Sequence, residues 1–141
     1  ERRFIDEGGD LTAVLRGTPG VRYQIYDFPG GPYLGYPQSY DVYGDGAIVL
    51  VPAPGHTPGS IVVFLALPDG QRLALLGDLC WQREGVTERR QRPWLLRQLG
   101  DHDVALARRQ LLHMSALAAA LPQLTLVPAH DERGYQGLPD L

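Results

Sequence analysis

The chain has 141 residues, of which 44% are hydrophobic and 21% are charged, and its net charge is −3. This is the composition of one soluble globular domain, and the slightly negative charge argues against nucleic acid or an anionic membrane as a partner. The single cysteine, Cys80, cannot form an internal disulfide, so we expect a reducing compartment, the cytoplasm.

Residues 1–46 have an irregular pattern and are predicted to form a connecting segment. Within it, 4–17 favours a short helix, and 20–28 alternates like a strand. Residues 29–46 are rich in Gly, Pro and Tyr and predict a long ordered loop. Its tyrosines either line a pocket or pack at the surface: Tyr33, Tyr36, Tyr40 and Tyr43. Tyr36 and Tyr40 are our candidates for contacts with a substrate.

The second part of the chain, 47–141, contains short apolar runs that are bounded by turns. Such runs fit strands that are buried on both faces of a sheet. The predicted strands are 47–51, 61–67, 72–77 and 124–129. Between the last two, the Arg-rich stretch 83–92 is predicted to be a solvated loop, with attraction of an anionic substrate as the alternative, and 92–100 favours a two-turn helix.

From Asp101 to Leu121, apolar residues recur at spacings of three and four, which predicts an amphipathic helix over 103–121. Asp101 or Asp103 can cap its start, and Pro122 ends it. His113 lies off the apolar stripe and is expected to be solvated. Strands and helix together indicate an α+β fold, a mixed sheet with helices on one face.

Three potential metal ligands each follow a predicted strand. His56 lies in a turn of two prolines and two glycines after the first strand, Asp78 follows the third, and His130 follows the last. Two imidazoles and a carboxylate are donors that Zn²⁺ accepts, and strand ends converge at one edge of a sheet. Each residue alone has another reading, because His56 fits a plain loop, Asp78 a turn, and His130 a surface pair with Asp131.

The sequences around these residues resemble the metallo-β-lactamase superfamily. The stretches that carry the resemblance are PGHTPGS at 54–60, LLGDLCW at 75–81 and LVPAHD at 126–131. The resemblance implies that His56 binds a first metal ion, that Asp78 bridges two ions and is catalytic, and that His130 binds the second. The implied cofactor is zinc, two ions in the complete site, with iron or manganese as alternatives. Thr57 and Asp131 are expected to orient the histidines.

The chain also departs from that family. The family motif H-x-H-x-D-H, which supplies most of the ligands, is absent, since no histidine precedes His56. The family fold is a four-layer αββα sandwich of two similar halves, and residues 47–141 resemble its C-terminal half only. The chain begins with Glu1 rather than Met, so we expect a processed product or a fragment. We expect its partner to be the missing N-terminal half, on another chain or fragment, or a second copy.

The function implied by the resemblance is that of a lactonase-like, metal-dependent hydrolase. Its expected substrate is a small-molecule ester, lactone, thioester or β-lactam-like compound, attacked by a metal-bound hydroxide. This chain alone is expected to be inactive. The alternative is a degenerate, non-catalytic half-fold that acts as a binding or structural module.

Overall fold

The computed structural model describes residues 26–91, 93–95 and 100–136. The strands of the described residues are β1 (Tyr40–Asp41), β2 (Ile48–Pro52), β3 (Ile61–Ala66), β4 (Arg72–Gly77) and β5 (Leu124–Pro128). The helical elements include α3 (Arg83–Thr87), α5 (Val104–Ala120) and the 3-10 turn η1 (Glu132–Gly134).

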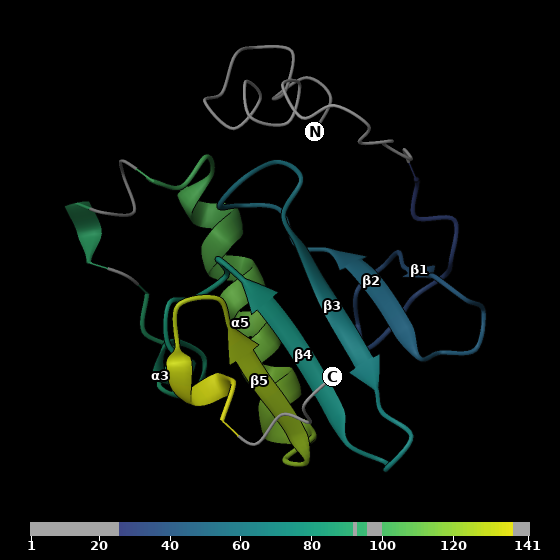
Figure 1. Ribbon diagram of the computed structural model, residues 1–141. Coiled ribbons are helices and arrows are strands. Elements are labelled where there is room, and N and C mark those ends of the chain that lie inside the picture. Colours follow the sequence, from purple (N-terminus) through teal and green to yellow (C-terminus); the bar gives the residue numbers. More distant parts are fainter. Residues whose placement is uncertain (1–25, 92, 96–99, 137–141) are drawn as a thin grey trace, which may run out of the picture.

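The strands form one mixed sheet in the order β1-β2-β3-β4-β5 (Figure 1). Neighbours from β1 to β4 are antiparallel, whereas β5 runs parallel to β4. A parallel neighbour requires a crossover connection, and α3 and α5 lie in the connection between β4 and β5. The predicted α+β class with a mixed sheet is confirmed.

The hydrophobic core lies between the sheet and α5, which covers one face (Figure 1). From the helix, Leu111 and Met114 are buried, and from the sheet Val62, Phe64 and Leu76 meet them. The shorter helix α3 packs beside α5 and buries Val86 in the same core. The predicted stretch 83–92 is therefore partly helical, because Val86 gives it an apolar anchor.

The prediction that the strands are buried on both faces is wrong for β2 and β3. Val49 and Val51 of β2 are buried and alternate with partly exposed neighbours, and β3 alternates in the same way. Successive side chains of a strand point to opposite faces, and α5 covers only one of them. The other face, which we call the open sheet face, carries partly exposed apolar residues: Ile48, Leu50, Ile61, Val63, Leu65 and Leu75.

The predicted helix over 103–121 is confirmed as α5, Val104–Ala120. Of the two proposed caps, Asp103 performs the role, because its carboxylate accepts a hydrogen bond of 2.8 Å from the backbone N–H of Leu106. The helix ends before Pro122, which cannot donate to a further turn.

The N-terminal predictions have mixed outcomes. The helix predicted at 4–17 lies outside the described residues, as do most of the strand predicted at 20–28 and half of the helix at 92–100. The loop predicted at 29–46 is wrong in part. Its residues 40–41 form β1, which pairs with β2, and isolated bridges join Gly30 to Ser39 and Tyr33 to Tyr36. Of this stretch only β1 joins the sheet, as its edge strand.

Candidate metal centre

The three predicted ligands lie at one edge of the sheet. Because β2 and β4 are both antiparallel to β3, they share a direction, and β5 runs parallel to β4. The chain therefore leaves β2, β4 and β5 at the same edge, where His56, Asp78 and His130 follow within four residues of each strand. Topology, rather than proximity in the sequence, brings these side chains together.

The structure brings both histidines to the carboxylate of Asp78. Nε2 of His130 lies 2.8 Å from Oδ1 of Asp78, and Nε2 of His56 lies 3.9 Å from Oδ2. The first distance is a hydrogen bond, and the second is a near approach. The side chains of Asp78 and His130 are open to solvent, at 39% and 57% exposure, whereas that of His56 is at 24%. The site is thus a shallow, accessible cluster.

The turn that carries His56 is held by its own hydrogen bonds. Ala53 donates to the carbonyl of Ser60 at 2.8 Å, which closes the turn between β2 and β3. The hydroxyl of Thr57 lies 3.0 Å from that of Ser60, whose oxygen also accepts from the Thr57 N–H. Thr57 thus closes the turn that presents His56, and its role in orienting the histidines stays a prediction.

The same turn is also fastened to the residues just before α5. The carbonyls of Gly55 and His56 accept backbone hydrogen bonds from Asp103 and His102, at 2.9 and 3.0 Å. Asp101 adds a side-chain contact, because its Oδ1 lies 3.0 Å from Nδ1 of His56. Sequence reasoning considered Asp101 only as a helix cap. Its pairing with His56, 45 residues away in the sequence, leaves no local sequence signal.

Asp131 has a different role from the predicted one. Its carboxylate is buried and accepts from the backbone N–H of Arg83 at 3.0 Å and from Nε of Arg133 at 2.8 Å. Arg133 also forms a two-pronged ion pair with Glu84, both contacts being 2.7 Å. The prediction that Asp131 orients the histidines is corrected, because this carboxylate ties the segment after β5 to the start of α3.

This network sets a testable pH dependence. The hydrogen bond from Arg133, with that from the Arg83 N–H, lowers the pKa of Asp131 from 3.8 to about 2. Because the pKa is lower in the folded state, the stabilisation is complete above pH 3.8 and is lost as the pH falls toward 2. In Asp131→Asn we expect a lower melting temperature at pH 7 and a flatter decline between pH 4 and 2. Thermal melts across pH, with Asp69→Asn at an exposed turn as control, test this, and equal slopes would contradict it.

The two candidate tyrosines do not contact the cluster. Tyr36 is buried at 3% exposure against Phe64 and the ring of His113, with ring centroids 6.2 and 4.5 Å apart. Its hydroxyl has no hydrogen-bond partner among the described residues, and burial raises the pKa of this hydroxyl. Tyr40 stacks on Tyr26 at 5.2 Å. The assignment of Tyr36 as a substrate contact is therefore corrected, because its ring is a packing group of the core, whereas the assignment of Tyr40 stays a prediction.

The prediction that His113 is solvated, which is based on its place off the apolar stripe, is also wrong. Its Nε2 lies 3.1 Å from the carbonyl oxygen of Leu34, and its ring packs against Tyr36. The turn formed by 33–36 covers this part of α5, so His113 is partly buried rather than solvated. Single-helix periodicity could not reveal a turn that arrives from about 80 residues earlier in the chain.

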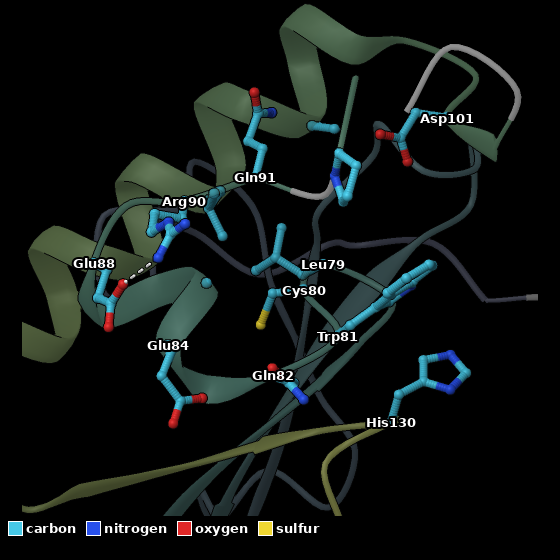
Figure 2. A pocket seen from close by; sticks show the side chains of 14 residues that line it. Leu79, Cys80, Trp81, Gln82, Glu84, Glu88, Arg90, Gln91, Asp101 and His130 are labelled. Atoms are coloured by element: carbon cyan, nitrogen blue, oxygen red, sulfur yellow. Dashed lines mark hydrogen bonds and ion pairs between the residues drawn. The ribbon is translucent and has the colours of Figure 1, made fainter. Parts of the chain in front are cut away.

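A cavity of about 640 Å³ lies beside the cluster, between α5 and the segment from Leu79 to Pro93 (Figure 2). His130, Asp101 and Trp81 line it, and the rings of Trp81 and His130 are 6.2 Å apart. Its polar lining includes Glu88, which pairs with Arg90 at 3.1 Å. A cavity of this size can hold a small organic molecule against the cluster.

The donor atoms fit a divalent metal in kind, but the cluster is incomplete. Imidazole nitrogens and carboxylate oxygens are zinc ligands. Among the described residues, however, no three or more His, Cys, Asp or Glu side chains are arranged to hold a metal ion. His130 and Asp78 instead bond to each other, and metal binding would displace the proton they share. The three residues therefore fit part of a metal centre that needs further ligands.

In comparisons with known proteins, the chain likewise matches only part of longer proteins. No family model matches the chain. It is 33% identical over 63 residues to the N-acyl homoserine lactonase AttM of Rhizobium radiobacter, and to that of Agrobacterium fabrum (strain C58). Each match covers 45% of this chain and 22% of the relative. The chain thus matches only about a fifth of the length of these curated relatives.

Solved structures extend the likeness over more of the chain. An N-acyl homoserine lactone hydrolase with N-hexanoyl-L-homoserine bound at its catalytic metal centre superposes with a TM-score of 0.55. The match covers 72% of this chain and 36% of that one, at 18% identity. A variant of B. thuringiensis AiiA with bound N-decanoyl-L-homoserine and a quorum-quenching lactonase match equally well. At this identity the likeness shows the fold. None of the described helices has the length and apolar character needed to cross a membrane.

Proposed function

We propose that this chain, which has the fold of part of a metallo-β-lactamase-superfamily protein, supplies the C-terminal half of a metal-dependent lactone hydrolase. Its proposed metal ligands are His56, Asp78 and His130. The observation that carries the proposal is the convergence of two imidazoles on one carboxylate at a single sheet edge, beside a cavity. The lactonases among its relatives support the substrate class.

The residues of the chain would have separate roles in such a site. Asp78, whose two carboxylate oxygens each lie beside one histidine, would hold the ions together with Nε2 of His56 and Nε2 of His130. Two zinc ions are the proposed complement, and they would polarise the substrate carbonyl and activate water. The side of the cavity lined by Trp81 and Leu79 would hold the part of the substrate that does not react, and exclude water from it.

The remaining ligands have to come from residues beyond this cluster. Catalytic zinc takes three protein ligands per ion, so three residues are too few for two ions. The chain also spans well under half of the lactonases it resembles. We therefore propose that a complementary N-terminal half, bearing the H-x-H-x-D-H motif, completes the centre.

The open sheet face is the proposed docking surface for that half. Leu50, Val63 and Leu75 are aligned across three adjacent strands, and all three are partly exposed. Apolar residues that line up over several strands form a continuous patch, which soluble monomers seldom leave bare. A sheet from the complementary half would cover it with an interface on the order of 2,000 Å² in total.

A charge placed in this patch should prevent assembly. In Val63→Asp, the carboxylate would be buried without a partner, and we expect affinity for the complementary half to fall on the order of 100-fold or more. Sedimentation velocity of the two halves, expressed separately and mixed, measures this. Leu112→Asp is the matched control, since Leu112 is exposed on α5, on the other side of the sheet.

Assembly of Val63→Asp with wild-type affinity would contradict the docking surface. Self-association of this chain at micromolar concentration, lost in the same variant, would identify a second copy as the occupant instead.

The function itself is tested on the assembled protein. The chain is produced with the complementary half, its bound metal is measured by mass spectrometry, and the opening of an N-acyl homoserine lactone is followed by acid release. We expect about two metal ions per assembly and turnover that a chelator abolishes. An assembly without metal or turnover would instead support the alternative, a non-catalytic binding module.

A further inference from the structure

We infer that Asp101 is a positioning residue that sets the tautomer of the His56 ring, so that Nε2 presents its lone pair toward Asp78. The inference rests on the proposed function for its purpose, but its physical content concerns only this chain. Its basis is the contact of 3.0 Å between Oδ1 of Asp101 and Nδ1 of His56.

The chemistry of the two groups decides which nitrogen carries the proton. An ionised carboxylate can only accept hydrogen bonds, so the contact requires a hydrogen on Nδ1. A neutral imidazole has one such hydrogen, which leaves Nε2 as the atom with a free lone pair. Nε2 is the nitrogen that approaches Asp78, at 3.9 Å. The contact with Asp101 thus leaves Nε2 of His56 available to bind a metal ion on the side that faces Asp78.

Burial strengthens this contact, and Asp101 is the more deeply buried partner. The side chain of Asp101 is 2% exposed, whereas that of His56 is 24% exposed. A carboxylate removed from water needs polar partners inside the protein, and the Nδ1 hydrogen is one of them. Electrostatic attraction is also less screened at such a position. The geometry therefore favours one tautomer of His56 over the mixture that an exposed histidine adopts.

The backbone holds the two partners in register. The adjacent residues His102 and Asp103 donate to the carbonyls of His56 and Gly55 at 3.0 and 2.9 Å. Asp101 and His56 therefore lie on segments that two backbone hydrogen bonds tie together directly beside the contact. Because Asp103 already caps α5, the carboxylate of Asp101 is not required for that purpose. Its pairing with His56 is a separate task.

The test reads the tautomer directly, on the metal-free protein. The protein is labelled with ¹⁵N-histidine, and long-range ¹⁵N–¹H spectra are recorded near pH 8, about 1.5 units above the usual histidine pKa. Its four histidines are assigned by single substitutions. In the wild type we expect His56 to carry its hydrogen on Nδ1. In Asp101→Ala we expect a shift toward the Nε2–H form, and in Asp101→Asn, whose amide oxygen still accepts, the wild-type form.

A second readout follows metal affinity in the assembled protein. Loss of a carboxylate that orients a ligating histidine typically weakens metal binding about 10–100-fold. We expect that loss in Asp101→Ala and most of the affinity restored in Asp101→Asn, measured by competition with a chromophoric chelator. Asp103→Ala is the control, because it removes the helix cap and leaves the His56 contact in place.

Two results would overturn the inference: wild-type His56 with its hydrogen on Nε2, or an unchanged tautomer in Asp101→Ala. The wild-type spectrum remains decisive even where that variant fails to fold. The tautomer is read on the metal-free protein and does not depend on metal. If the spectra are as expected but the assembled protein binds no metal, the role of Asp101 is upheld and the proposed hydrolase is refuted.

Discussion

Asp78→Ala is expected to abolish most turnover of the assembled protein and to weaken metal binding, while the fold stays largely intact. Loss of an outer carboxylate costs roughly 10–100-fold in metal affinity or activity, so loss of a bridging ligand should exceed 100-fold. The fold should tolerate the change because Asp78 follows β4 and its side chain is 39% exposed. The measurements are kcat/KM for lactone opening, the metal content and the melting temperature.

The matched control for that prediction is Asp69→Ala. Asp69 lies in the exposed turn before β4, so it is separated from Asp78 by the length of the strand. This variant removes the same carboxylate and should retain wild-type turnover. Wild-type kinetics in Asp78→Ala would end the hydrolase proposal for this cluster.

Gly55→Ala should be among the most destabilising single changes in the chain. A Cβ at this position would lie 2.5 Å from both Cα and N of Ala107, which are backbone atoms of α5. The φ angle of +149° is also one that residues with a side chain rarely adopt. Overpacking of about 1–3 kcal/mol and a backbone penalty of about 1–3 kcal/mol together predict a loss of roughly 2–6 kcal/mol.

Chemical denaturation of Gly55→Ala measures this loss, with Gly44→Ala as the control. Gly44 also has a positive φ, +76°, but a Cβ there would meet no atom within 4 Å. The control should therefore show the backbone penalty alone. Metal affinity should fall with Gly55→Ala as well, because the clash would push the His56 turn away from α5. Equal stability of the two variants would show that the contact with Ala107 yields easily.

Local sequence patterns were sufficient for most of the elements. Short apolar runs bounded by turns predicted β2, β3, β4 and β5, and a spacing of three and four predicted α5. These signals are reliable because strand and helix periodicity depend on neighbours within a few residues. The pattern could not tell which faces are covered. The open sheet face exists because α5 reaches one side only, and no residue of β2 or β3 encodes that by itself.

The sequence by itself also determined the three candidate ligands, because each is a side chain of a type that can bind metal and lies directly after a strand or its turn. Only the tertiary structure decided what surrounds them. Asp101 joins His56 across 45 residues, whereas Asp131, next to His130, turns to Arg133 and Arg83. Thr57, next to His56, bonds to Ser60. Adjacency in the sequence misled because hydrogen bonds form between atoms that folding brings together, and the path of the chain between β4 and β5 placed Asp101 beside His56 and Arg83 beside Asp131.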